Sequence, residues 1–214
     1  MINNYENERS VTRRYSDPLD AIWTATLHRL GFRLERSEHV YASVDENRVL
    51  TIGASCTLDA DDCLAQMILH ELCHALIQTD EERQKPDWGL RNTDDSDRAK
   101  EHATLRLQAA LTERHGLRWV FAPTTNFRAY YDALPIDPLS VADAAESESV
   151  LVASNDGWTR ATEGPWSGAL NDALVASEII VRATTPFCSA MPSEPATNLP
   201  LVFGDFDEKP RKNR

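Results

Sequence analysis

Two histidines four residues apart, with a glutamate directly after the first, are the clearest candidates for chemistry in this sequence. They are His70, Glu71 and His74 in the stretch ILHELCHALI. Side chains at positions i and i+4 of an α-helix lie about 40° apart around its axis, so the two imidazoles can hold one metal ion. Glu71 lies about 100° from His70, beside such an ion, where it can accept a proton from water. This order of residues predicts a bound Zn²⁺ with a glutamate as general base.

Chance placement rarely produces this pattern. With 6 histidines in 214 residues, random placement yields about 0.01 such motifs per chain. The residues around the motif are apolar on nearly every side, which predicts a buried helix whose polar side chains need partners. The competing interpretation, two core histidines that bind no metal, is therefore disfavoured.

An HExxH helix that follows a helix and a β-hairpin, and precedes a further helix, resembles the zincin metallopeptidases. The resemblance covers residues 18–115. It implies an α+β fold in which a small β-hairpin or sheet packs on the active-site helix, with further helices around it. It also implies a zinc metallopeptidase, a hydrolase in which His70 and His74 bind the metal and Glu71 is the general base.

A catalytic zinc site usually has three protein ligands and one open position, so a third ligand is expected. Glu101 fits the arrangement of gluzincins and resembles that of the ImmA/IrrE-like metallopeptidases. His102 is the alternative on the same predicted helix, and helical geometry does not separate the two. His115, followed by Gly116, more weakly resembles the HG segment of SprT-like proteases, but it lies farther from the HExxH helix than in that family. The metzincin pattern HExxHxxGxxH is absent.

Other residues are candidates for roles around the metal. Tyr130 or Tyr131 can donate a hydrogen bond to the developing oxyanion and so stabilise the transition state, as can Arg128. Asp87 and Trp88, in the loop after the HExxH helix, are candidates for orienting a histidine or lining a substrate cleft. For each of these residues, ordinary packing is the competing interpretation.

The four cysteines, Cys56, Cys63, Cys73 and Cys188, leave three interpretations open. Their spacing matches no common zinc or iron–sulfur pattern, although a thiolate cluster remains one interpretation. A disulfide between Cys188 and one of the others is the second. The third is that all are free thiols, because a free cysteine often serves as a small buried hydrophobe.

Cap residues, apolar spacing and turn residues predict the elements that position the motif. These are a helix from Pro18 to just before Gly31, a hairpin within His39–Ala54, a helix capped by Thr57 or Asp59 and ending near Gln78, a helix capped within 94–97 and ending near Arg114, and a helix over residues 165–183. The acidic segment 137–155 is predicted to be a linker or partly helical. The predicted organisation is a flexible arm (1–15), a metallopeptidase domain (16–135), a helical extension packed on it (136–183) and a mobile tail (184–214).

Composition limits the classes of partner and compartment. A net charge of −12 argues against nucleic-acid binding. No apolar run reaches the roughly 20 residues of a membrane helix, and no signal peptide is visible, which together predict a cytoplasmic protein. The expected function is zinc-dependent hydrolysis of a peptide or protein substrate. The alternative is a non-catalytic regulatory or structural protein that retains a metal-binding HExxH site.

Overall fold

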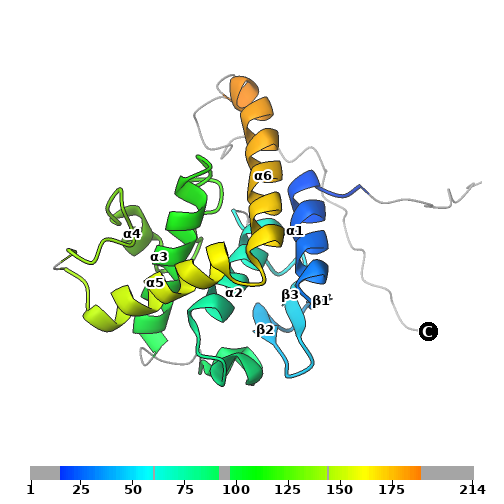
Figure 1. The fold of residues 1–214 in the computed structure, drawn as a ribbon. Helices are drawn as coiled ribbons and strands as arrows, with labels where there is room; N and C mark the ends of the chain where they lie inside the picture. Colours follow the sequence, from blue (N-terminus) through cyan, green and yellow to red (C-terminus); the bar gives the residue numbers. More distant parts are fainter. Residues whose placement is uncertain (1–14, 60, 92–96, 144, 189–214) are drawn as a thin grey trace, which may run out of the picture.

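The computed structural model describes residues 15–59, 61–91, 97–143 and 145–188, which form a largely helical α+β fold with one small sheet (Figure 1). The predicted α+β class is therefore confirmed. Most of the predicted arm and tail lie outside the described residues. In chain order the elements are α1 (Pro18–Arg29), β1 (Arg33–Ser37), β2 (Ala42–Val44), β3 (Val49–Gly53), α2 (Leu64–Ile77), the 3₁₀ turns η1 (Glu82–Gln84) and η2 (Pro86–Gly89), α3 (Arg98–Glu113), α4 (Arg128–Asp132), α5 (Glu148–Glu163) and α6 (Ser167–Cys188).

Helix α1 begins and ends where its sequence signals predict. The Asp17 side chain accepts hydrogen bonds from the backbone N–H groups of Leu19 and Asp20, and Pro18 occupies the first helical position. Gly31 follows the helix with a φ of 84°, a left-handed conformation that glycine adopts without steric cost.

The predicted hairpin is present as strands β2 and β3, which pair antiparallel with Val44 opposite Leu50. Its turn is closed by Asp45, whose Oδ1 accepts hydrogen bonds from the backbone N–H groups of Asn47 and Val49. Strand β1, which the sequence did not predict, pairs parallel with β3 on the other side, so the strand order is β1-β3-β2. Strand β2 is therefore an edge of the sheet.

The predicted N-cap of the motif helix was wrong. Helix α2 begins at Leu64, and Cys63 is its cap, because its Sγ accepts a hydrogen bond from the N–H of Gln66 at 3.3 Å. Thr57 instead donates to a backbone carbonyl three residues earlier. Asp59 lies in the turns before the helix. The predicted end near Gln78 is confirmed, since Gln78 is the C-cap.

Helix α3 matches its prediction, whereas the two later helices are more extensive than predicted. Helix α3 runs from Arg98 to Glu113, and Gly116 follows with a φ of 65°. The predicted linker or partly helical segment contains the first half of a complete helix, α5. Helix α6 continues to Cys188, five residues beyond its predicted end at Ala183.

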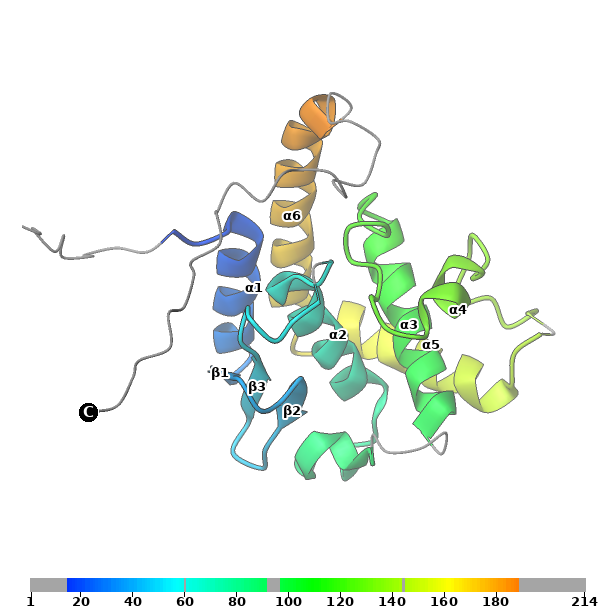
Figure 2. The ribbon, with the colours of Figure 1, turned by 180° about the vertical axis from the view of Figure 1, so that it is seen from behind.

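Helix α2 lies at the centre of the molecule, where it contacts α1, α3 and α5, while α6 runs beside α1 (Figures 1 and 2). Gly157 lets α5 approach α2 and α3 closely. A Cβ at that position would lie 2.9 Å from Cδ2 of Leu107 and 3.0 Å from Cγ2 of Ile77. The sheet shares this core, because Leu50 and Ile52 are buried in the same cluster as the apolar residues of α2.

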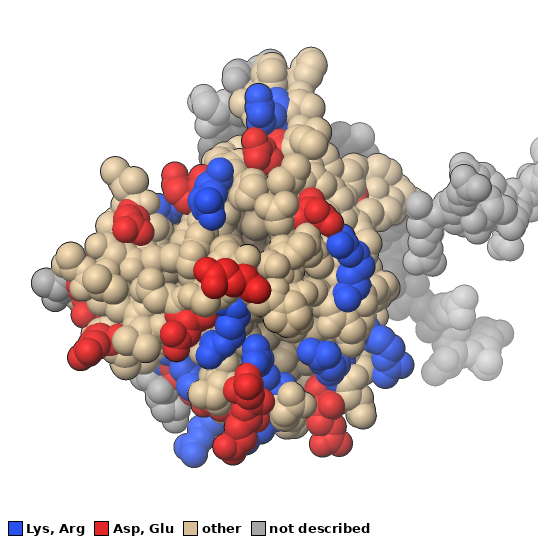
Figure 3. Space-filling view, viewed as in Figure 1, with Lys and Arg blue, Asp and Glu red and all other residues tan. Residues whose placement is uncertain are grey.

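The surface carries both signs of charge. On the face seen in Figure 3, basic side chains alternate with acidic ones rather than forming one continuous basic area. Within the described residues, none of the helices combines the length and the apolar character that a membrane span requires.

Candidate metal centre

Helix α2 presents His70 and His74 one turn apart on the same face. The helix is buried along nearly its whole length, and its apolar residues pack into the main core. The two rings stand almost perpendicular, and their Nε2 atoms lie 3.1 Å apart. The spacing in the motif therefore brings two imidazole nitrogens to one point, as the sequence predicts.

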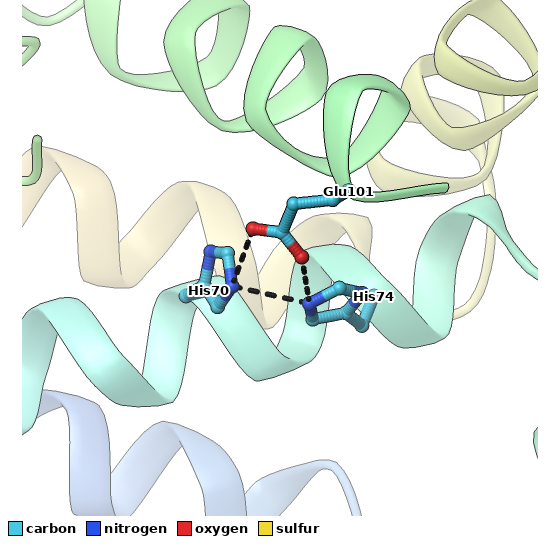
Figure 4. A group of neighbouring side chains, drawn as sticks. All are labelled: His70, His74 and Glu101. Carbon is cyan, nitrogen blue, oxygen red and sulfur yellow. Dashed lines mark hydrogen bonds and ion pairs between the residues drawn. The ribbon is translucent and has the colours of Figure 1, made fainter. Parts of the chain in front are cut away.

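Helix α3 supplies Glu101 opposite this pair (Figure 4). Its Oε1 lies 3.4 Å from Nε2 of His70, and its Oε2 lies 3.2 Å from Nε2 of His74. One ligand atom from each of the three residues falls within 4.8 Å of the others. Two imidazoles and one carboxylate are a donor set of catalytic zinc sites, so the group can hold a metal ion and is compatible with zinc.

Side chains behind the histidines fix which nitrogen faces the centre. Nδ1 of His70 lies 2.9 Å from Oε1 of Gln108, a carbonyl oxygen that can only accept, so this nitrogen carries the proton. Nδ1 of His74 lies 3.0 Å from the hydroxyl of Thr104. Both partners are fully buried. Hydrogen bonds of this kind set the tautomer and orient the ring, which leaves Nε2 as the metal-binding atom.

The sequence reasoning did not identify Thr104 and Gln108, although a signal was present. They follow Glu101 by three and seven residues, spacings that place all three on one face of a helix. Polar residues on the buried face of a helix require partners, and here their partners are the two histidines.

The electrostatics of the group favour a bound cation. Burial lowers the pKa of His70, but the charge of Glu101 and its hydrogen bond outweigh burial and raise this pKa to about 9. Burial raises the pKa of Glu101, but both histidines outweigh it and hold the carboxyl pKa well below its usual range. Two adjacent nitrogen lone pairs and a carboxylate attract positive charge, which a proton or a metal ion supplies.

Glu71 lies beside the three candidate ligands and contacts a tryptophan. Its Oε2 accepts a hydrogen bond from the indole Nε1–H of Trp88 at 3.2 Å. The sequence marked Trp88 and Asp87 for orienting a histidine or lining a cleft. Both line the cavity, and the indole N–H of Trp88 donates to Glu71 rather than to a histidine.

The turn η2 that carries Trp88 has an unusual backbone. Asp87 and Trp88 have φ angles of 48° and 57°, and Gly89 follows with 72°. The left-handed region costs non-glycine residues roughly 1–2 kcal/mol each, and it is rare for a bulky side chain. Oδ1 of Asp87 accepts a hydrogen bond from the N–H of Val44 at 2.8 Å, which ties the turn to the edge strand β2.

A cavity of about 340 Å³ opens over the metal group. Its lining includes the apolar residues Met67, Leu90, Pro123 and Phe127. The hydroxyls of Tyr41 and Thr124, which line the cavity, both donate to the carboxylate of Asp62, which joins three loops. The ionisable residues among its described lining are histidines, acids and one tyrosine, with no lysine or arginine, namely Tyr41, His70, Glu71, His74, Asp87 and Glu101.

The two rival third ligands lie elsewhere. Nδ1 of His102 is 3.2 Å from Oε2 of Glu146, and its ring stacks on Tyr130 with centroids 3.7 Å apart. Nδ1 of His115 is 3.0 Å from Oε2 of Glu178. The structure therefore brings Glu101, and neither of these histidines, to His70 and His74.

The predicted transition-state stabilisers are not brought to the cavity. The Tyr130 hydroxyl donates to Oε2 of Glu146 at 2.6 Å and accepts from Nε of Arg106. Tyr131 is buried in a separate cluster, and burial raises its pKa to about 12. Arg128 pairs with Asp132 on the surface. Tyr130, Tyr131 and Arg128 are absent from the cavity lining, which contains Tyr41 instead.

The four cysteines are free thiols and do not gather at one point. Cys56 and Cys188 are exposed, Cys63 caps α2, and Cys73 is buried on the same helix. Burial raises the pKa of the Cys73 thiol, so the neutral form that packs in the core is favoured over a thiolate ligand. Among the described residues, the group within metal-binding distance contains no cysteine.

Comparison of the chain with protein-family models, with curated proteins and with solved structures found no match. The case for a metal centre therefore rests on the residues themselves. It consists of the HExxH motif on α2, a carboxylate from α3, and hydrogen bonds to Gln108 and Thr104 that orient the two imidazoles.

Proposed function

We propose that the protein is a zinc-dependent metallopeptidase in which His70, His74 and Glu101 hold the metal and Glu71 is the general base. The observation that carries this proposal is the meeting of three ligand atoms within 4.8 Å in a cavity that Glu71 also lines. Three protein ligands leave one coordination position for water or substrate, which is the arrangement of catalytic rather than structural zinc.

Bound zinc would lower the pKa of a water molecule and polarise the scissile carbonyl. Glu71 would accept the proton of that water and then deliver it to the leaving amine. Its position beside the ligands on α2 suits a base and not a ligand, because its side chain leaves the helix about 100° from that of His70. The indole of Trp88 donates to one carboxylate oxygen, and no described residue donates to the other, which can accept the proton.

The cavity suits a peptide substrate in an extended conformation. Apolar residues of its lining, including Met67 and Phe127, can bury a substrate side chain in a cavity that the metal group also lines. Burial of the candidate ligands keeps bulk water away from most of the centre and strengthens its electrostatic interactions.

The test is hydrolysis of a mixed peptide library by metal-depleted protein to which zinc is returned. In wild type, the rate of product release is expected to rise with added zinc until one zinc per chain is bound. Glu71→Gln is expected to bind the same zinc and to lose hydrolysis by about 10²–10⁴-fold, the usual contribution of a general base. Glu81→Gln, at an exposed position on the following turn, is the matched control and is expected to behave as wild type.

If zinc binds and wild type and Glu71→Gln release products equally, the proposed mechanism is wrong. If zinc binds and neither releases products from any peptide, the non-catalytic metal-binding alternative replaces the peptidase.

A further inference from the structure

We propose that Trp88 is a positioning residue for Glu71, and that the left-handed turn η2 exists to hold its indole in place. The inference rests on the proposed function, in which Glu71 is the general base. Its starting point is the 3.2 Å hydrogen bond from the indole Nε1–H to Oε2 of Glu71. This contact joins residues on two elements, α2 and η2, that both line the cavity.

The backbone of the turn is strained at the residue that makes this contact. Asp87 and Trp88 are consecutive non-glycine residues in the left-handed region, at φ/ψ of 48°/32° and 57°/23°. A tryptophan rarely adopts this conformation, because its Cβ crowds the backbone. Such strain persists where the surroundings fix it, and it is concentrated at functional sites.

Three contacts fix the turn. Oδ1 of Asp87 accepts from the N–H of Val44 at 2.8 Å, and the carbonyl of Asp87 accepts from the N–H of Leu90 at 2.8 Å. The indole of Trp88 is 4% exposed and packs edge-on against Phe32, with ring centroids 5.8 Å apart. The indole is therefore anchored at its backbone and at its ring, so its N–H keeps a fixed direction.

A fixed donor changes what Glu71 can do. A glutamate side chain has several rotatable bonds, and a free carboxylate would sample many positions beside the metal group. The indole N–H holds Oε2, and no described residue donates to Oε1, which can accept the proton of a water molecule. Holding a reacting group in its productive position raises the rate, and a misplacement of about 1 Å can cost about a hundredfold.

The chain contains a control for the edge contact of this tryptophan with Phe32. Trp166 also packs edge-on against Phe32, with ring centroids 5.7 Å apart, but it does not line the cavity. Trp→Phe at either position shortens a ring that packs on Phe32, although Trp88 is 4% exposed and Trp166 is only half-buried. At position 88 alone, the substitution also removes the hydrogen bond to Glu71.

The kinetic test compares Trp88→Phe with Trp166→Phe in the zinc-loaded protein. We expect Trp88→Phe to lower kcat about 10- to 100-fold, with KM and zinc content unchanged, and Trp166→Phe to lower kcat less than about threefold. An equal decrease of kcat in the two variants, or a higher KM with unchanged kcat, would overturn the positioning role. Asp87→Asn keeps a side-chain oxygen for Val44 and tolerates the left-handed region, so it should lose less kcat than Asp87→Ala.

A spectroscopic test reads the contact without relying on activity. The five tryptophans each give one indole N–H resonance in a ¹⁵N-correlated NMR spectrum, and the two Trp→Phe variants assign those of Trp88 and Trp166. In Glu71→Ala, the Trp88 resonance is expected to shift and exchange faster with water while that of Trp166 stays in place. An unmoved Trp88 resonance would overturn the inference.

The two tests separate this inference from the proposed function. If wild type shows no zinc-dependent hydrolysis, the peptidase proposal fails and the role of Trp88 in catalysis fails with it. If wild type hydrolyses peptides and Trp88→Phe matches Trp166→Phe, only the positioning role is wrong.

Discussion

Gln108 holds the ring of His70 from behind, with its Oε1 2.9 Å from Nδ1 of the imidazole. The Nε2 amide of the same glutamine donates to the backbone carbonyl of Phe121, so both polar atoms of its side chain form hydrogen bonds. A buried glutamine fixed in this way determines both the tautomer and the direction of His70.

Gln108→Met should therefore weaken metal binding. Methionine has a similar volume but cannot accept the hydrogen bond from Nδ1 of His70, so we expect zinc affinity to fall about 10- to 100-fold. Competition with a chromophoric chelator measures this affinity. Gln84→Met, at an exposed position, is the control and should leave it unchanged. Equal affinities in Gln108→Met and wild type would mean that this hydrogen bond does not orient a ligand.

The metal-free protein should lose stability at alkaline pH. The folded pKa of His70 is raised from 6.5 to about 9. A group whose pKa is raised on folding stabilises the fold below its unfolded pKa, and this contribution is lost as the pH rises through about 9. Glu101 has a lowered pKa, so its contribution is present above 4.5 and is lost as the pH falls towards its folded pKa. Thermal melts in a chelator should therefore show a lower Tm near pH 9 than near pH 6.

Bound zinc should stabilise the protein more as the pH rises. Protons and zinc compete for the same nitrogen atoms, so zinc affinity rises with pH. Because ligand binding to the folded state stabilises it, the difference in Tm between zinc-loaded and metal-free protein should grow from about pH 6 to about pH 9. A difference that stays constant over this range would contradict a zinc site that contains His70.

Gly157 should be intolerant of a side chain. A Cβ there would contact Leu107 and Ile77 at 2.9 and 3.0 Å, so Gly157→Val must push α5 away from α2 and α3. Overpacking of this kind lowers the free energy of unfolding by about 1–3 kcal/mol. Gly168→Val is the matched control, because no atom lies within 4 Å of a Cβ at that helical position. Chemical denaturation measures both variants, and equal stabilities would mean that α5 does not pack as described.

The elements that the sequence predicts correctly have strong local signals. Asp17 and Pro18 start α1, and Gly31 ends it, through backbone preferences that depend little on the rest of the fold. Turn residues predict the hairpin, and the spacing of the HExxH motif predicts helix α2. Each signal lies within a few residues of the structure that it specifies.

The elements that the sequence missed or predicted only in part depend on distant contacts. Strand β1 has no buried residue along its length, with Leu34 only half-buried, so it lacks the apolar alternation of a strand. It forms because β3 offers it a partner. Helix α5 contains Asp156 and Gly157, which disfavour a helix locally, but its packing against α2 and α3 requires the glycine.

The third candidate ligand shows the same limit at the site. Glu101 and His102 are neighbours about 100° apart on one helix, so the sequence offered both. The packing of α3 against α2 turns Glu101 towards the histidine pair, whereas His102 faces Tyr130 and Glu146. The cavity's tyrosine, Tyr41, comes from the segment before β2, which no local pattern connects with the motif.

Zinc content of purified variants tests most directly whether His70, His74 and Glu101 form one metal centre. We expect about one zinc per chain in wild type and in His102→Ala, and its loss in Glu101→Ala under the same chelator challenge. All three proteins should keep the same far-ultraviolet circular dichroism, which excludes unfolding as the cause. Zinc retained in Glu101→Ala and lost in His102→Ala would contradict the centre described here, as would a wild type that binds no zinc.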